Sequence, residues 1–203
     1  NSNNDKVRTL ILKEFVAMKL EKLLLDSGQL PEMQEIHADV EIQGISFDSR
    51  EVKKGYLFIA LEGGISDGHK YIINAVEAGA VAVVGRKDIP GSKVPYFRTE
   101  NPRKAMAHIA AAFYGFPARS LTVIGVTGTD GKTTTVNLIY QSLLACGLKA
   151  GMISTVNAVI GQESIDTGFH VTTPESLTVQ ALLRKMVDAG ITHVVLETTS
   201  HGL

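Results

Sequence analysis

Apolar strands and amphipathic helices alternate along the second half of the chain. A β-branched apolar run at residues 121–126 predicts a buried strand, and the glycine-rich stretch at 127–131 separates it from an amphipathic helix that begins near Lys132. The elements expected after this helix are a strand at 149–154, a helix at 175–189 and a strand at 192–197. Because such alternation favours a parallel sheet with right-handed crossovers, the pattern predicts an α/β unit from residue 121 onward.

The first half of the chain predicts a separate, small α/β unit. Apolar residues recur at helical spacing over 7–25, and Gly28 and Pro31 end that pattern. The other elements expected are strands at 41–47, 56–61, 80–84 and 95–98 and helices at 71–78 and 101–114. The stretch GFPARS at 115–120 has no periodicity and is interpreted as a linker between the two units.

Met18 is interpreted as a candidate native start within the first predicted helix. The polar residues at 1–5 fit a frayed end or a remnant of an expression vector. The domains expected are an N-terminal extension at 1–17, a first domain at 18–116 and an incomplete second domain at 121–203.

Composition narrows the range of partners. The 203 residues are 44% hydrophobic, which is enough to bury a core, and the net charge of -1 offers no electrostatic footprint for nucleic acid or an anionic membrane. Cys146 is the only cysteine, so no intrachain disulfide can form and a reducing compartment is expected. No apolar run reaches the length of about 18 residues that a membrane helix needs. We expect a cytoplasmic protein; its oligomeric state is left open.

The stretch that follows the strand at 121–126 has the chemistry of a polyphosphate site. Gly128 and Gly131 allow backbone N–H groups to converge on an anion, and the helix N-terminus adds partial positive charge. Lys132 would neutralise the β and γ phosphates, and the hydroxyl of Thr133 would hold Mg²⁺. The strict P-loop pattern requires glycine where this chain has Val126, so a glycine-rich turn before an ordinary helix is the alternative.

Polar residues follow all three predicted strands of the second unit. The carboxyl ends of parallel strands share one edge of a sheet, where ligands bind, so these residues are expected to converge. They are Thr127 to Thr133 after the first strand, Thr155 and Asn157 after the second, and Glu197 to His201 after the third. Glu197 is interpreted as a metal ligand, with a satisfied surface carboxylate as the alternative, and His201 is assigned no chemistry.

Four segments of the chain carry a resemblance to the Mur ligases, over about residues 18 to 203. They are FDSREVKKGYLFIALEGGISDGH (47–69), VTGTDGKTTT (126–135), TTPE (172–175) and ETTSHGL (197–203). The first two are shared with the family member that adds D-alanyl-D-alanine. The last two favour the member that extends UDP-N-acetylmuramoyl-dipeptide by one amino acid of the lysine or diaminopimelate class.

The resemblance implies an ATP-dependent ligase of peptidoglycan synthesis that works through an acyl phosphate, with Lys132 and Glu197 as catalytic residues and Mg²⁺ on Thr133 and Glu197. It implies that the ATP phosphates contact Gly128, Thr129, Asp130, Gly131, Lys132, Thr133 and Thr134. It implies that the uridine contacts Phe47, Ser49, Gly64, Ile65 and Ser66, and that the muramoyl-peptide contacts Thr172, Thr173 and Thr199. Two positions depart from the family pattern: Asp130 adds negative charge beside the phosphates, whereas Thr199 keeps a hydroxyl.

The family's further magnesium ligands and its C-terminal domain have no counterpart in these residues, so we expect an N-terminal fragment that does not ligate alone. The sister ligase and a non-catalytic nucleotide-binding protein are the alternatives. Read without the resemblance, several motifs have simpler interpretations. Asp48 and Arg50 form a turn with a surface ion pair, Asp67-Gly68-His69 form a turn, and Thr172 to Glu175 form an ordinary helix start.

Overall fold

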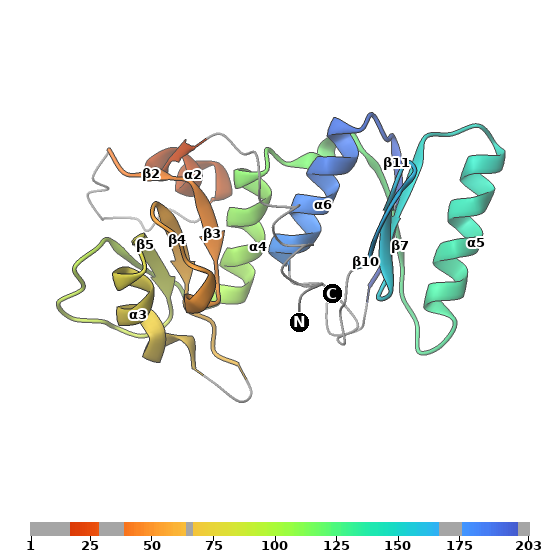
Figure 1. Ribbon diagram of the computed structural model, residues 1–203. Helices are drawn as coiled ribbons and strands as arrows, with labels where there is room; N and C mark the ends of the chain where they lie inside the picture. Colours follow the sequence, from red (N-terminus) through yellow and green to blue (C-terminus); the bar gives the residue numbers. More distant parts are fainter. Residues whose placement is uncertain (1–16, 29–38, 64–66, 167–175, 199–203) are drawn as a thin grey trace. The chain divides into compact units, whose positions relative to one another are not determined.

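The computed structural model describes residues 17–28, 39–63, 67–166 and 176–198 (Figure 1). Its contacts divide the chain into two compact units, with the division between Phe113 and Tyr114. Each unit combines helices with parallel strands, so the predicted α/β class is confirmed. Within the described ranges, no helix is both long enough and apolar enough to cross a membrane.

A four-stranded parallel sheet forms the centre of the N-terminal unit. Its strands, in spatial order, are β3 (Gly44–Ser46), β4 (Tyr56–Ile59), β5 (Ala80–Gly85) and β6 (Tyr96–Arg98). Its helices are α2 (Leu20–Ser27), α3 (Ile72–Glu77) and α4 (Pro102–Phe113), with 3₁₀ turns η1 (Ser49–Glu51) and η2 (Gly68–Tyr71). The strands predicted at 56–61, 80–84 and 95–98 and the helices predicted near α3 and α4 are confirmed. The single strand predicted at 41–47 is divided into β2 (Glu41–Ile42), which belongs to a separate two-stranded sheet, and β3.

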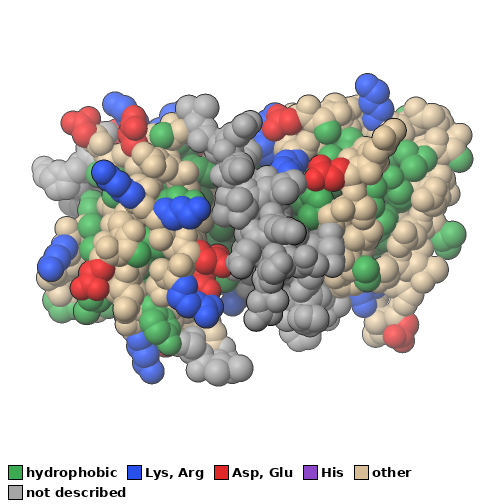
Figure 2. Space-filling model, viewed as in Figure 1, with side chains coloured by type: hydrophobic (Ala, Val, Ile, Leu, Met, Phe, Trp, Pro, Cys, Tyr) green, Lys and Arg blue, Asp and Glu red, His purple; other side chains and the backbone are tan. Residues whose placement is uncertain are grey.

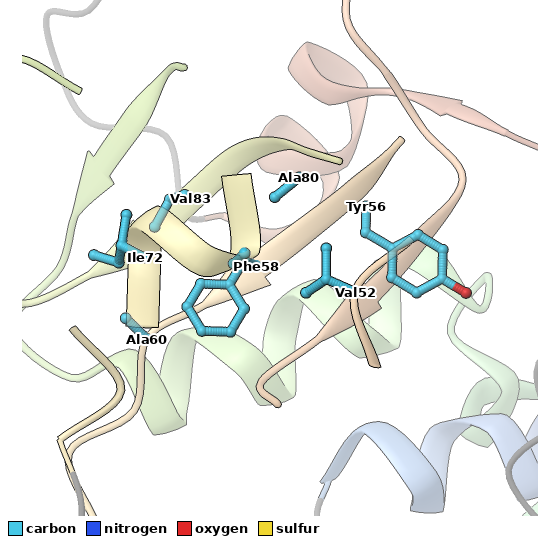
Figure 3. Packing of buried hydrophobic residues seen from close by; sticks show 8 residues of the cluster. Val52, Tyr56, Phe58, Ala60, Ile72, Ala80 and Val83 are labelled. Atoms are coloured by element: carbon cyan, nitrogen blue, oxygen red, sulfur yellow. The ribbon is translucent and has the colours of Figure 1, made fainter. Parts of the chain in front are cut away.

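One hydrophobic cluster of this unit lies between β4, β5 and α3. Alternate residues of one strand point to one face of a sheet, and Tyr56, Phe58 and Ala60 therefore face the same cluster. Figure 3 shows that Phe58 of β4, Ile72 of α3 and Val83 of β5 contribute to one cluster. Leu57 and Ile59, on the opposite face of β4, are also fully buried. Burial on both faces explains why the sequence of β4 is a continuous apolar run and not an alternating one.

The first predicted helix is wrong at Met18. Met18 and Lys19 form a short strand, β1 (Met18–Lys19), that pairs antiparallel with β2 (Glu41–Ile42). The backbone N–H of Leu20 donates to the carbonyl of Val40, and α2 begins only at Leu20. Helical spacing could not reveal this, because the pairing partner lies about twenty residues away in the sequence. The predicted helical residues 7–16 lie outside the described ranges.

The C-terminal unit contains a five-stranded sheet in the order β10, β9, β8, β11, β7. Its elements in chain order are β7 (Thr122–Val126), α5 (Lys132–Ala145), β8 (Ala150–Ile153), β9 (Asn157–Ile160), β10 (Glu163–Asp166), α6 (Ser176–Asp188) and β11 (His193–Glu197). Strands β8, β11 and β7 run parallel, which confirms the three predicted strands and the alternation with helices. Val136 and Tyr140 of α5 pack on Ala150, Met152 and Val195 of the sheet.

A β-hairpin in this unit was missed by the sequence analysis. Strands β9 and β10 pair antiparallel and extend the sheet beyond β8, with Gly161 at φ 61° in the turn between them. The signal in the sequence was weak, because Gly161 and Gln162 mark a turn but neither NAVI at 157–160 nor ESID at 163–166 alternates apolar with polar residues. The predicted linker at 115–120 is also more ordered than expected, because residues Pro117–Ser120 form the 3₁₀ turn η3.

Charges of both signs are interspersed on the face of the N-terminal unit that Figure 2 shows. This mixture agrees with the net charge of -1, and the described residues on that face form no extended basic patch. A nucleic-acid interface would require Lys and Arg side chains to be gathered in one place.

Candidate functional site

The loop between β7 and α5 has the backbone conformation of an anion-binding turn. Gly131 caps α5 at φ 72°, and Gly128 lies at φ 151°. Among the described residues other than its chain neighbours, no atom lies within 4 Å of the position that a Cβ at Gly131 would occupy, so the glycine is required by its backbone angle and not by crowding. The helix that follows presents unpaired N–H groups and partial positive charge to the loop. This end of the unit is suited to bind phosphate.

Lys132 folds back over the loop that precedes it. Its Nζ donates to the backbone carbonyls of Gly128, at 2.9 Å, and of Thr129, at 3.0 Å. The ammonium is thereby held beside the loop, where its partners are neutral carbonyl oxygens. A phosphate oxygen carries full negative charge and is a stronger acceptor for an ammonium group. The arrangement therefore leaves Lys132 available to an anion in the loop.

Glu197 is the buried acid of this site. It ends β11, which lies between β7 and β8 in the sheet, and it is only 2% exposed. Its Oε2 accepts hydrogen bonds from Thr133 Oγ1, at 3.0 Å, and from the backbone N–H of Thr155, at 3.2 Å. The predicted convergence of these three residues on one edge of the sheet is confirmed, and the alternative of a surface carboxylate for Glu197 is wrong.

The charge on Glu197 has no cationic partner among the described residues, where no Lys, Arg or His nitrogen lies within 4.0 Å of it. A buried carboxylate without a counter-ion costs several kcal/mol of desolvation. The hydroxyl oxygen of Thr133 and the carboxylate oxygens of Glu197 lie together, and oxygen atoms are the hard ligands that Mg²⁺ prefers. The residues present therefore fit a small divalent cation.

Several predicted binding residues lie outside the described ranges. They are Gly64, Ile65, Ser66, Thr172, Thr173 and Thr199, together with His201. Thr129, Asp130 and Thr134 are exposed on the loop and on the first turn of α5. Phe47 and Ser49 are half-buried where β3 leads into η1. The structure therefore brings together the predicted phosphate and metal residues, and it describes two of the five predicted uridine residues.

Asp48 and Arg50 form the turn and ion pair that the simpler interpretation predicted. The carboxylate of Asp48 caps η1 by accepting from the backbone N–H of Arg50, at 3.0 Å. The guanidinium of Arg50 also contacts both carboxylate oxygens, with Nε at 2.9 Å from Oδ1 and Nη2 at 2.6 Å from Oδ2. Because the Arg50 side chain is 86% exposed, solvent screens this ion pair and its contribution to stability is small.

Asp67, Gly68 and His69 do more than form a turn. His69 is buried, and its Nδ1 lies 2.6 Å from Asp67 Oδ1. Its Nε2 accepts the backbone N–H of Arg86, at 2.9 Å, directly after β5. Nε2 must therefore be unprotonated, so the ring is neutral and carries its proton on Nδ1. The imidazole joins the segment before α3 to the end of β5, which the sequence analysis did not foresee.

Three potential metal ligands meet near this histidine, namely Glu62, Asp67 and His69. Lys87 Nζ lies 2.5 Å from Asp67 Oδ2 and 3.7 Å from Glu62 Oε1, and Arg86 also pairs with Glu62. Both nitrogens of His69 are engaged as well. Lys87 and Arg86 therefore already provide the positive charge that a metal would supply to Glu62 and Asp67.

Asp67→Asn is expected to destabilise the protein at neutral pH but progressively less in acid. The hydrogen bond from Lys87, followed by that from His69, holds the pKa of the Asp67 carboxyl below its usual range. A carboxyl with a lowered pKa stabilises the fold above its unfolded pKa of about 4, and this contribution is lost as pH falls through the folded value. We expect urea unfolding to show a loss of about 1–2 kcal/mol at pH 7 that shrinks below about pH 4.

Asp88→Asn is the matched control for this experiment. Asp88 also pairs with a cation, Arg98, but its side chain is 78% exposed, so a change below about 0.5 kcal/mol is expected. A loss for Asp67→Asn that is equal at both ends of the pH range would contradict the assigned charge network.

Fold and site together have the architecture of an α/β unit of the P-loop type, whose glycine loop is suited to bind phosphate. Its first strand leads through a glycine loop into a helix that begins with Lys-Thr, and the neighbouring strand ends in a buried acid. The family model described as "Mur ligase middle domain" matches residues 126–203, and the model described as "Mur ligase family, catalytic domain" matches residues 41–114. The chain belongs to the Mur ligase family.

Curated relatives of high similarity carry closely related names. A UDP-N-acetylmuramyl-tripeptide synthetase of Treponema pallidum is 46% identical over 176 residues, which is 84% of this chain and 32% of the relative. A UDP-N-acetylmuramoyl-L-alanyl-D-glutamate--2,6-diaminopimelate ligase of Chlorobium phaeobacteroides is 46% identical over 162 residues, or 78% of this chain and 31% of the relative. The chain therefore spans about a third of the length of these curated relatives.

Solved structures support the fold. A UDP-N-acetylmuramoyl-L-alanyl-D-glutamate--2,6-diaminopimelate ligase superposes with a TM-score of 0.73 at 24% identity, covering 92% of this chain and 37% of that one. A D-alanyl-D-alanyl ligase from Acinetobacter baumannii superposes with a TM-score of 0.57 at 21% identity. The superposition covers 92% of this chain and 37% of that one. At these identities the likeness shows a shared fold.

Proposed function

We propose that this chain supplies the ATP-phosphate, Mg²⁺ and uridine sites of an ATP-dependent ligase in peptidoglycan synthesis. The ligase would join an amino acid of the diaminopimelate or lysine class to UDP-N-acetylmuramoyl-L-alanyl-D-glutamate through an acyl phosphate. The observation that carries the proposal is the contact of Thr133 with the buried Glu197 at the end of the glycine loop. The names of the relatives support the substrate class.

The loop and helix residues have distinct roles in this proposal. The N–H groups around Gly128 and Gly131 would bind phosphate oxygens, and Lys132 would exchange its carbonyl partners for the β and γ phosphates. Thr133 can keep its hydroxyl hydrogen on Glu197 while its oxygen lone pair faces the metal. When bound, Mg²⁺ would neutralise charge on the transferring phosphoryl group. Thr129, Asp130 and Thr134 complete the proposed phosphate site.

The remaining binding residues are proposed from the family resemblance. Phe47, Ser49 and residues 64–66 would contact the uridine, within a domain at 18–116. Thr172, Thr173 and Thr199 would contact the muramoyl-peptide, within a second domain at 121–203. We propose a cytoplasmic location, which is supported by the absence of a second cysteine from these 203 residues.

The runner-up is the D-alanyl-D-alanine-adding ligase of the same family. The first-listed relatives, at 39–46% identity, carry the tripeptide-synthetase or diaminopimelate-ligase name. A nucleotide-binding protein without ligase activity would bind ATP but not the UDP-linked dipeptide.

Calorimetric titration tests this proposal in two arms. Since the site contacts phosphates and a cation, we expect ATP to bind in Mg²⁺, with affinity falling about tenfold or more from ATP to ADP and again to AMP, and falling in EDTA. We also expect UDP-N-acetylmuramoyl-dipeptide to bind in preference to the UDP-linked tripeptide. Equal affinity for ATP and AMP would refute the phosphate site, and a preference for the tripeptide would favour the sister ligase.

A further inference from the structure

The two carboxylate oxygens of Glu197 are used unequally. Oε2 accepts from Thr133 Oγ1 at 3.0 Å, from the backbone N–H of Thr155 at 3.2 Å and from Thr155 Oγ1 at 3.4 Å. Within the described residues, no hydrogen bond reaches Oε1. Two of the three contacts thus come from one residue, Thr155, in the turn after β8.

The turn that carries Thr155 is held in place independently of Glu197. Ser154 is 1% exposed, and its hydroxyl accepts the N–H groups of Val156, at 3.2 Å, and Asn157, at 3.1 Å. The backbone N–H of Ser154 donates to the carbonyl of Asn157, at 2.8 Å. The side-chain amide of Asn157 in turn donates to Ser164 Oγ on β10, at 3.2 Å. The β8–β9–β10 strands therefore fix the donors of Thr155 before any ligand arrives.

A carboxylate that is fixed through one oxygen meets a cation with the other. Ca²⁺ takes six to eight oxygen ligands, and carboxylates can bind it through both oxygens at once. Mg²⁺ is smaller and demands near-octahedral geometry with one oxygen from each carboxylate and several waters. Hydrogen bonds from the protein to Oε2 of Glu197 therefore disfavour binding of a cation through both carboxylate oxygens, and so they disfavour Ca²⁺ relative to Mg²⁺.

We propose that Thr155 is a positioning residue that fixes Oε2 of Glu197, so that only Oε1 meets the cation and the site selects Mg²⁺ over Ca²⁺. The inference rests on the proposed function, since it takes the cation to be the one that accompanies ATP. It gives a role to the hairpin β9–β10, which anchors the turn. Thr155 itself contacts neither cation nor phosphate in this scheme.

The test is ATP binding by the intact chain, measured by calorimetry in Mg²⁺ and separately in Ca²⁺. Removing a group that orients a metal ligand typically costs 10–100-fold in metal affinity, and Thr155→Val keeps one of the two donors of Thr155. We therefore expect about a tenfold loss of affinity in Mg²⁺, a smaller loss in Ca²⁺, and restoration of both by Thr155→Ser. Thr192→Val, at the opposite edge of the same sheet, is the matched control and is expected to change neither affinity.

The outcomes separate the inference from the proposed function. If the unaltered chain shows no metal-dependent ATP binding, both fail together. If it binds and Thr155→Val keeps both affinity and preference for Mg²⁺, only the inference fails. Equal losses in the two metals would show a general structural role and would also refute it. Should Thr155→Val not fold, Thr155→Ala removes the same hydroxyl without placing a methyl group against the carboxylate, and the same expectations apply.

Discussion

Lys132→Ala is expected to lower the affinity of the chain for ATP by about 100-fold or more. Removing one member of a close ion pair typically costs 2–5 kcal/mol, and 1.4 kcal/mol corresponds to tenfold in affinity. Without ATP the ammonium contacts only the two loop carbonyls, so the free energy of unfolding should change by no more than about 1 kcal/mol. Calorimetric titration with ATP in Mg²⁺ gives the affinity, and urea unfolding gives the stability.

Lys149→Ala is the control for this loss. Lys149 is an exposed lysine of the same unit, located before β8 at the opposite edge of the sheet from the loop. If the loss arises from the position of Lys132 and not from the general charge of the unit, Lys149→Ala will bind ATP as the unaltered chain does. Comparable losses in both variants, or none in either, would exclude the glycine loop as the phosphate site.

Glu197→Gln is expected to change stability and ligand binding in opposite directions. In the absence of metal, Glu197 is a buried carboxylate with neutral hydrogen-bond donors and no cation among the described residues. A glutamine keeps an oxygen for Thr133 and Thr155 but removes the charge, so the free energy of unfolding in EDTA should rise by about 1 kcal/mol. The same substitution removes a charged metal ligand and should abolish the dependence of ATP binding on Mg²⁺.

Thermal unfolding in EDTA, in Mg²⁺ alone and in Mg²⁺ with ATP measures both effects. The unaltered chain should gain stability when Mg²⁺ and ATP are added together, because both bind only the folded state. Glu197→Gln should unfold at a higher temperature than the unaltered chain in EDTA, and its unfolding temperature should rise little when Mg²⁺ and ATP are added. Glu163→Gln removes an exposed carboxylate from β10 and should behave like the unaltered chain. A Glu197→Gln variant that is less stable in EDTA would show that the carboxylate is satisfied without a cation.

The phosphate loop was predictable from the sequence because all of its parts are local. Strand, glycines, Lys132 and Thr133 are consecutive, and each contributes by its own backbone preference or charge. The partnership of Thr133 with Glu197 spans 64 residues, yet it followed from one topological rule about the ends of parallel strands. The rule works for this unit since all three strands that carry the site are parallel.

Other features depend on contacts that no local pattern encodes. The strand at Met18 exists only because residues 41 and 42 pair with it. The buried bridge from His69 to the end of β5 joins residues 17 positions apart, and the triplet Asp-Gly-His alone resembles an ordinary turn. The selectivity proposed for Thr155 depends on which oxygen of Glu197 it contacts. The two oxygens of one carboxylate are only a few ångströms apart, so no sequence pattern can tell which of them Thr155 contacts.

The position of β11 has a consequence for how this unit forms during synthesis. β11 lies between β7 and β8, and it pairs with both of them. When the ribosome has made β7, the loop, α5 and β8, the two strands still lack β11, which separates them in the finished sheet. The phosphate loop therefore cannot gain its acidic partner until residues 193–197 have emerged and inserted into the sheet. Pairing between strands that are far apart in the sequence is slow. The glycine loop of a nascent chain is therefore present before Glu197 reaches Thr133.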